Sequence, residues 1–204
     1  MRMRTWLPDG SVLSKDILGR FAREQEVHSV ISRHVAGRSL VEIGTRNGDG
    51  MVCFARVARS AMAIEMDPKY CKRLEQRAKP TMFAKPTFTI MCDNYQKHSL
   101  DAEVFTWWQQ LPELKNEEVL QHLRGQQEAG SIRADAEAIL LFELGYPDDM
   151  RSYHVLRNLT RWSETVRFDE MALCKTRWNK PWFHKRSHGS FRVIGVRIAD
   201  VRRS

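Results

Sequence analysis

The chain has 204 residues, 42% of them hydrophobic, which is enough for a single domain with one sizeable core. Its 33 Lys and Arg outnumber 25 Asp and Glu, for a formal net charge of +8. No apolar stretch approaches the roughly 18 residues of a membrane span, and the N-terminus lacks the apolar core of a signal peptide, so we expect an intracellular, cytoplasmic protein without a membrane partner.

Residues 1–36 predict an N-terminal helical segment. Within residues 14–35 the apolar side chains recur at approximately helical spacing, which favours a lid or a packing helix. These side chains are Ile17, Phe21, Val27, Ile31 and Val35.

Residues 39–50 combine an apolar run with an acid and closely spaced glycines. This pattern predicts a strand, a glycine turn and then a helix over residues 49–59. A glycine turn at the carboxyl end of a parallel strand lets a ligand approach the backbone closely, and it directs the free amide groups of the next helix toward that ligand. The sequence therefore predicts a nucleoside-cofactor site at this turn.

Two further apolar runs each end in polar residues. Residues 61–64 precede Glu65, which lies 21 residues (65 − 44) after the first glycine of the turn. A carboxylate at the tip of the second strand of a βαβ unit can accept hydrogen bonds from both hydroxyls of a ribose, and a spacing of about 20 residues is the expected one. Residues 87–92 precede Asp93 and Asn94. We expect all these polar groups at one edge of a sheet.

Strands and helices continue to alternate along the rest of the chain. A helix over residues 68–78 starts with proline, which suits the first helical position, and a loop over 79–86 follows. Further strands are expected at 103–106, 138–144, 166–171 and 191–198, and further helices at 116–127 and 149–159. The last two strands are expected to be antiparallel neighbours. This alternation predicts a three-layer α/β sandwich.

Residues 41–48 resemble the first motif of class I S-adenosylmethionine (SAM) dependent methyltransferases, and residues 63–68 resemble the second. The resemblance covers roughly residues 38–108. It implies a Rossmann-like sandwich in one domain over residues 1–204, with a mostly parallel seven-stranded sheet and an antiparallel C-terminal strand. One departure is Asn47, which stands near the place where many members carry another glycine.

The resemblance also implies SAM as the cofactor and methyl transfer as the reaction. Carried over to this chain, Glu42 and Gly44 shape the methionine end of the pocket, and Gly48 lets the turn close. Glu65 holds the ribose, and Asp93 meets the adenine amino group. The implied cofactor-binding residues are Glu42, Ile43, Gly44, Thr45, Gly48, Glu65, Met66, Asp93, Asn94 and Thr106.

Competing assignments of the glycine turn fit the sequence less well. The glycine spacing is not the Gly-x-Gly-x-x-Gly of dinucleotide-binding proteins, and the Gly-Lys-Ser/Thr of a phosphate-binding loop is absent, which disfavours hydride transfer and nucleotide hydrolysis. A nucleotide-binding enzyme of another chemistry stays open, because fold does not fix function. Taken singly, Gly44 and Gly48 could be ordinary turn glycines, Glu65 a solvated surface acid and Asp93 a helix N-cap. The order and spacing of these residues disfavour that combination.

The residues after the fourth strand do not identify the methyl acceptor. Trp107 and Trp108 are expected to contact it, stacking on a planar group or facing the sulfonium, with the alternative that either one belongs to the core. The Asn/Asp-Pro-Pro-Tyr and Pro-Cys motifs of nucleic-acid methyltransferases are absent. An anionic small molecule, a protein and RNA all remain possible acceptors. Seven histidines offer general bases without pointing to one, so no catalytic residue is assigned.

Residues 174–190 predict a long basic loop that contains two Trp and one Phe. Residues 174–204 hold nine of the 33 Lys and Arg and one acid, so they account for the whole excess of positive charge (9 − 1 = 8). Cations beside aromatic rings suit single-stranded nucleic acid, an anionic small molecule or an acidic protein. Alternatively, the Trp residues pack the loop onto the domain and its charges are solvated. The loop gives a second hypothesis, a non-catalytic protein of the same fold that binds nucleic acid or a protein partner.

The four cysteines are widely spaced and include no Cys-x-x-Cys pair. We therefore expect free thiols in a reducing compartment, and neither structural zinc nor another metal site. The cysteines are Cys53, Cys71, Cys92 and Cys174.

Overall fold

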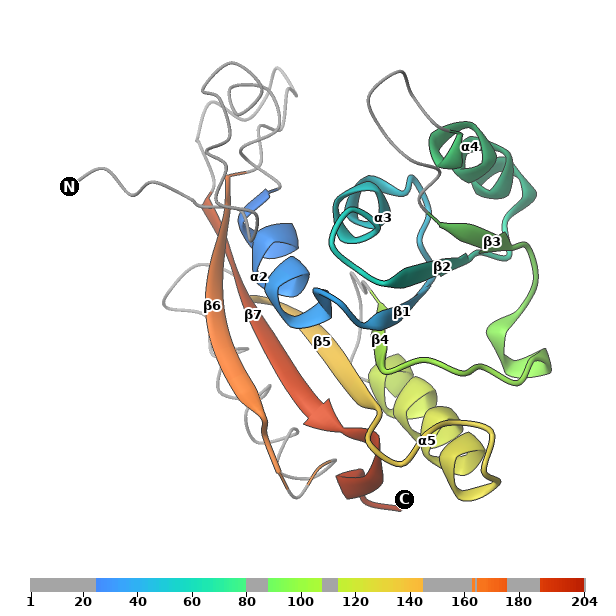
Figure 1. Cartoon of the computed structure of the whole chain (residues 1–204). Helices are drawn as coiled ribbons and strands as arrows, with labels where there is room; N and C mark the ends of the chain where they lie inside the picture. The colour runs from blue at the N-terminus through green and yellow to red at the C-terminus, as the bar shows by residue number, and fades with distance from the viewer. Residues whose placement is uncertain are drawn as a thin grey trace.

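The structure, a computed structural model, describes residues 25–79, 88–107, 114–144, 163, 165–175 and 188–203 (Figure 1). Its strands are β1 (Ser39–Ile43), β2 (Ser60–Ile64), β3 (Thr89–Met91), β4 (Val104–Trp107), β5 (Glu137–Leu144), β6 (Phe168–Lys175) and β7 (His188–Arg197). They form a seven-stranded sheet in the order β3-β2-β1-β4-β5-β7-β6. Strands β1 to β5 pair in parallel, and β7 is antiparallel to both of its neighbours. The expected mostly parallel sheet with a reversed C-terminal strand is confirmed.

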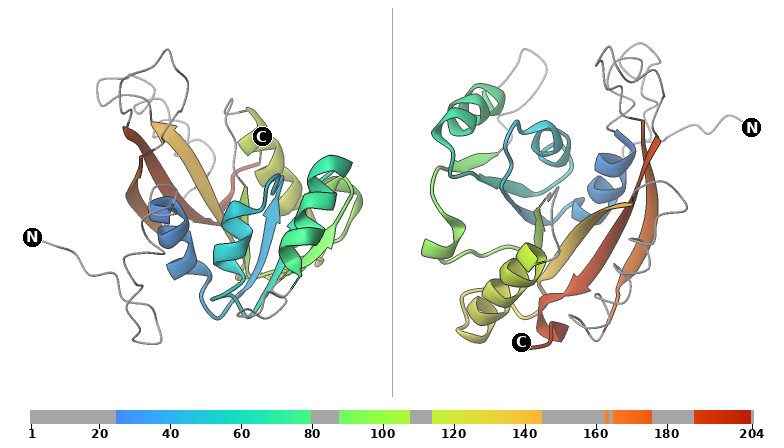
Figure 2. Two further views of the ribbon diagram at one scale, coloured as in Figure 1. Left: turned by 90° about the horizontal axis from the view of Figure 1, so that it is seen from above. Right: turned by 180° about the vertical axis from the view of Figure 1, so that it is seen from behind.

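Helices cover both faces of the sheet (Figures 1 and 2). The helices are α2 (Gln25–Val35), α3 (Asp49–Phe54), α4 (Pro68–Ala78) and α5 (Leu114–Glu128), and short 3-10 helices, η1 (Tyr95–Lys97) and η2 (Ile198–Asp200), follow β3 and β7. Within the part of the chain that the structure describes, no helix combines the length and hydrophobicity that crossing a membrane requires.

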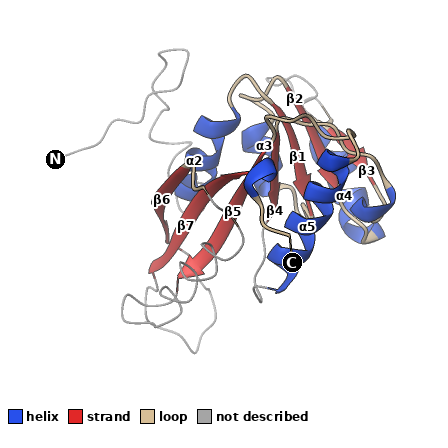
Figure 3. Cartoon of the chain, turned by 90° about the horizontal axis from the view of Figure 1, so that it is seen from below, coloured by secondary structure: helices blue, strands red, loops and turns tan. Residues whose placement is uncertain are grey.

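Alternating side chains of the central strands divide the core into two layers. Leu40 and Val104 pack with α2 and α3 on one face, whereas Val41 and Phe105 pack with α5 on the other. Successive residues of a strand point to opposite faces, so a parallel sheet covered on both sides needs nearly continuous apolar runs. This requirement explains why short apolar segments located the strands, and Figure 3 shows the resulting sheet between its helices.

The helix predicted over residues 68–78 is α4, with the same bounds. The Asp67 carboxylate caps it by accepting a hydrogen bond of 2.8 Å from the backbone N–H of Lys69, and Pro68 occupies the first turn. The helix predicted over residues 49–59 instead ends at Phe54. The chain turns back there, because Gly37 N donates to Val57 O over 2.8 Å.

The hairpin of β6 and β7 is longer than predicted. Lys175 pairs with His188, so both ends of the predicted basic loop over residues 174–190 are strands, which corrects its bounds. The pairing of β7 with both β5 and β6 extends the two strands beyond the residues that the apolar pattern predicts. The segment 176–187, the predicted helix 149–159 and most of the N-terminal segment 1–36 lie outside the described residues.

Cys71 and Cys92 form a disulfide, which corrects the expectation of free thiols for these two residues. Their Cα atoms are 5.8 Å apart, because the parallel pairing of β3 with β2 places the end of β3 beside the first turns of α4. Cys53 is a half-buried free thiol, and the side chain of Cys174 is outside the described part. The expectation of a reducing compartment therefore loses one of its grounds.

Candidate cofactor-binding site

The sequence motifs meet at the carboxyl edge of the sheet. Ile43, Ile64 and Met91 are register partners at the ends of β1, β2 and β3. Gly44 N and Thr45 N both donate to Ile64 O, over 2.8 and 3.3 Å, and Glu65 N donates to Met91 O over 3.0 Å. The backbone thus joins the glycine turn to the end of β2, and Glu65 to the end of β3.

The glycine turn bends through three residues in the left-handed region. Gly44, Arg46 and Gly48 have φ angles of 71°, 51° and 76°. The position between the two glycines that favours a further glycine is therefore Arg46, one residue before Asn47. Among the described residues, no atom lies within 4 Å of a Cβ built on Gly44. The turn therefore presents backbone with open space above it, as close approach of a ligand requires.

Gly48 closes the turn against α4 and allows a test. A Cβ at Gly48 would lie 2.6 Å from Cδ2 of Leu74, which is fully buried. We expect Gly48→Ala to lower the free energy of unfolding by about 1–3 kcal/mol, through backbone strain and overpacking. Gly125→Ala is the matched control. Gly125 lies inside α5, and no atom of the described part of the chain is within 4 Å of a Cβ built there, so alanine should raise stability, by up to about 1 kcal/mol. Urea unfolding measures both, and equal midpoints for Gly48→Ala and wild type would contradict the packing at Gly48.

Glu65 is buried and fixed by two backbone donors. Its side chain Oε2 accepts from Arg46 N over 2.7 Å, and Oε1 accepts from Asp67 N over 3.0 Å. The residue is 6% exposed, so the alternative of a solvated surface acid does not hold. A carboxylate has about four acceptor positions, and the two bonds leave capacity for further donors. Glu65 is therefore a preoriented acceptor beside the glycine turn.

One face of α4 holds the glycine turn in place. The guanidinium carbon of Arg46 lies 5.3 Å from the ring centroid of Tyr70, and Arg77 pairs with Asp49 at 2.7 Å. Between these contacts, Arg73 donates to the side chain of Asn47. Sequence reasoning missed these contacts, although residues 70, 73 and 77 have the spacing of a single helix face.

Glu42 lies beneath the turn with one oxygen unpartnered. Its Oε2 is buried and has no hydrogen-bond partner among the described residues, and a Cβ on Gly50 would lie 3.1 Å from Oε1. Burial raises the pKa of Glu42 to about 8, and the charge of Asp49 acts in the same direction. The side chain is therefore mostly protonated at pH 7.

This pKa predicts how stability depends on pH. The folded protein keeps the Glu42 proton up to about pH 8, whereas the unfolded chain loses it near pH 4.5. Unfolding releases a proton between these values, so the contribution of Glu42 to stability falls as pH rises through this window. Glu42→Gln removes that dependence. We expect the stability of the variant relative to wild type to increase by about 2–3 kcal/mol between pH 5.5 and 7.5 in urea unfolding. Parallel loss of stability in both proteins would contradict a protonated Glu42.

Asp93 and Met66 complete the edge near β2 and β3. The Asp93 carboxylate accepts from Lys97 Nζ at 2.9 Å, from Asn94 N at 2.7 Å and from His98 Nε2 at 3.0 Å. These donors hold the pKa of Asp93 well below its usual range. The N-cap of η1 is Asn94, whose Oδ1 accepts from Gln96 N over 3.0 Å, rather than Asp93. Met66, next to Glu65, is 74% exposed and offers an apolar surface.

No protein-family model matches the chain, and no curated protein matches it. Solved structures do match. Magnesium protoporphyrin IX methyltransferase from Synechocystis PCC 6803, with bound SAM, has a TM-score of 0.56 and 14% identity, covering 93% of this chain and 83% of that one. Precorrin-6y C5,15-methyltransferase from Geobacter metallireducens GS-15 has a TM-score of 0.55 and 14% identity, covering 97% and 96%. The fold is that of class I SAM-dependent methyltransferases.

A third match, ribosomal protein L11 methylase from Lactobacillus delbrueckii subsp. bulgaricus, has a TM-score of 0.54 and 10% identity, covering 85% of this chain and 78% of that one. These three methyltransferases differ in the acceptors that their names give. At such low identity, the likeness shows the fold alone.

Two residues that the sequence predicts to line the candidate site, Thr106 and Trp107, are buried and hydrogen-bonded inside the protein. The Thr106 hydroxyl is buried and donates to Ile139 O over 3.1 Å. The Trp107 side chain is 4% exposed in the core beneath α5, where its Nε1 donates to Asn116 Oδ1 over 2.7 Å. This placement favours the alternative that Trp107 belongs to the core. Trp108 lies outside the described residues.

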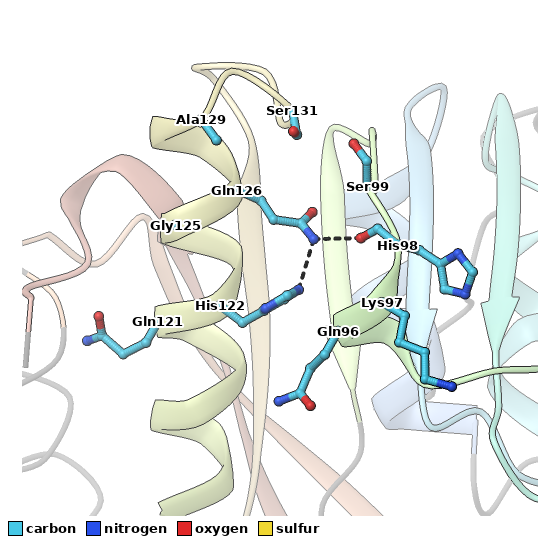
Figure 4. A pocket seen from close by; sticks show the side chains of 10 residues that line it. All are labelled: Gln96, Lys97, His98, Ser99, Gln121, His122, Gly125, Gln126, Ala129 and Ser131. Carbon is cyan, nitrogen blue, oxygen red and sulfur yellow. Dashed lines mark hydrogen bonds between the residues drawn. The ribbon is translucent and has the colours of Figure 1, made fainter.

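On the face of the sheet that α5 covers, a pocket of about 390 Å³ lies between α5 and the segment around η1 (Figure 4). The Gln126 amide nitrogen donates to His98 O over 2.6 Å and lies 2.9 Å from His122 Nε2. Burial lowers the pKa of His122, which suits a neutral ring that accepts from this amide.

The described residues include no cluster of three or more side chains suited to a metal ion.

Proposed function

We propose that the chain is a SAM-dependent methyltransferase of unassigned acceptor. The observation that carries this proposal is Glu65, a buried carboxylate that two backbone amides hold at the carboxyl edge, beside the open backbone of Gly44. A carboxylate fixed in this way can bind the two hydroxyls of a ribose. The class I methyltransferase fold supports the proposal, as does the SAM bound to the solved Synechocystis relative in fold.

The residues of the site fit SAM. Glu65 would hold the ribose, and Met66 and Asp93 would lie along the adenine. The open space at Gly44 leaves room for the methionine part of SAM to pass over the glycine turn. The unpartnered Oε2 of Glu42 suits the ammonium group of the methionine end. Bound there, SAM supplies an electrophilic methyl group on sulfur.

This chain's contribution to the reaction is positioning. Methyl transfer needs the attacking atom, the methyl carbon and the sulfur in line, and fixing that geometry can supply much of the rate. The fixed carboxylate of Glu65 and the backbone of the turn can set the position of the cofactor at the edge of the sheet. No general base is assigned.

The buried Glu42 predicts a proton linkage. An ammonium beside Glu42 favours the ionised carboxylate, so binding near pH 7 should release up to about one proton, because the pKa of the free site is about 8. Titration of S-adenosylhomocysteine in two buffers of different ionisation enthalpy measures this release. Equal heats in both buffers would argue against a cation beside Glu42.

Transfer of label from methyl-tritiated SAM tests the activity. Pools of small anionic metabolites, protein and RNA serve as acceptors, and Glu65→Ala is the matched inactive control. We expect label in one pool with wild type and none with the variant. Absence of transfer to every pool, with the cofactor still bound, would favour the second candidate function below.

We infer a second candidate, a non-catalytic protein of this fold that binds nucleic acid or an acidic partner. The antiparallel pairing places Lys175 and His188 near the carboxyl end of β5, where Leu144 pairs with Ser190. The basic segment 174–190 therefore leaves and re-enters the sheet at the edge that carries the cofactor motifs. Neutralising five cations tests the nucleic-acid version, which fails if RNA and DNA binding is unchanged. These cations are Lys175, Arg177, Lys180, Lys185 and Arg186.

A further inference from the structure

The disulfide of Cys71 and Cys92 borders both acids of the candidate nucleoside site. Cys92 directly precedes Asp93, and the Cys71 Sγ lies 3.2 Å from the carbonyl oxygen of Glu65. The bond therefore links the segment after β2, which carries the proposed ribose ligand, to the segment after β3, which carries the proposed adenine ligand. It lies beside the backbone hydrogen bond from Glu65 N to Met91 O.

β3 is a short strand at the edge of the sheet. It has three residues, and among the described residues its strand partner is β2 (Figure 1). An edge strand of this length has little pairing energy, so a covalent link at Cys92, the residue directly after β3, helps to fix the position of Asp93.

The two cysteines differ in access to solvent. Cys71 is buried, at 5% exposed, whereas Cys92 is exposed. Thiol–disulfide exchange requires attack on a sulfur that the reagent can reach, and Cys92 is the exposed residue of the pair. After reduction, the buried Cys71 thiol already has the Glu65 carbonyl oxygen within reach as an acceptor. Both redox states therefore have a partner for the buried sulfur.

We propose that the Cys71–Cys92 disulfide is a reversible redox site that sets the affinity of the cofactor site for its nucleoside. A thiolate of a reducing dithiol attacks Sγ of Cys92, the S–S bond breaks, and Cys71 leaves as a thiolate that takes up a proton. The second thiol of the reductant then resolves the mixed disulfide. The reductant ends as a disulfide, and the protein gains two electrons and two protons. The proposal rests on the proposed cofactor site.

The test compares oxidised and dithiol-reduced protein. Mass spectrometry of a non-reducing digest should show a cross-linked peptide pair that contains Cys71 and Cys92. Titration with S-adenosylhomocysteine should give an affinity at least about fivefold higher for the oxidised form, within the usual range of coupling between sites. Cys92→Ser, at the exposed position, should bind like reduced wild type and ignore the reductant. Cys53→Ser, the matched control, should respond like wild type.

Absence of the cross-linked peptide from oxidised protein overturns the proposal, and so does equal affinity in the two redox states. Equal and measurable affinity would contradict the redox coupling alone and leave the cofactor site intact. No binding in either state would contradict the cofactor site and the redox coupling together.

Discussion

Glu65→Ala is expected to weaken the binding of S-adenosylhomocysteine by about 100-fold or more. The variant loses a carboxylate that would accept from two ribose hydroxyls, and hydrogen bonds to a charged group contribute about 1.5–3 kcal/mol each. It also leaves the N–H groups of Arg46 and Asp67 without their acceptor. Isothermal titration measures the affinity, and circular dichroism verifies that the variant is folded.

Two variants make this result specific. Glu65→Gln keeps one acceptor oxygen, so its affinity should fall between those of wild type and Glu65→Ala. Glu75→Ala removes an exposed acid from α4 and should bind like wild type. Undiminished affinity in folded Glu65→Ala would remove the ribose assignment.

Trp107→Ala should lower the free energy of unfolding by about 3–5 kcal/mol. The side chain packs in the core beneath α5. Its removal also leaves the amide oxygen of Asn116, a residue that is only 5% exposed, without the Trp107 donor. Urea unfolding with fluorescence or circular dichroism measures the loss.

Met66→Ala is the matched control for Trp107→Ala, because Met66 is 74% exposed. It should leave stability nearly unchanged while weakening cofactor binding a few-fold. If Trp107→Ala lowered the free energy of unfolding by less than about 1 kcal/mol and also weakened acceptor binding, the result would favour a place for Trp107 in the acceptor pocket.

Local sequence signals located the strand ends and the acids that follow them. Glu65 and Asp93 were found from their positions after apolar runs, because parallel strands place their carboxyl ends at one edge. The pairing of Asp93 with Lys97 and His98 is also local, at four and five residues along the chain, and charge spacing could have predicted it.

Tertiary packing decided what the sequence did not reveal. Arg46 adopts a left-handed backbone that its residue type does not favour, and its N–H then reaches Glu65. The β2–β3 pairing brings Cys71 and Cys92 together, and no short sequence motif indicates that these two cysteines are close. An apolar residue at the end of β4 suits a pocket or a core equally, and the partner Asn116 on α5 decides for the core at Trp107.

Isothermal titration of the wild-type protein with S-adenosylhomocysteine tests the cofactor site most directly. We predict one site per chain with micromolar or tighter affinity. No detectable binding by the folded protein, in its oxidised and reduced forms alike, would contradict the cofactor site and leave the likeness to methyltransferases a matter of fold alone.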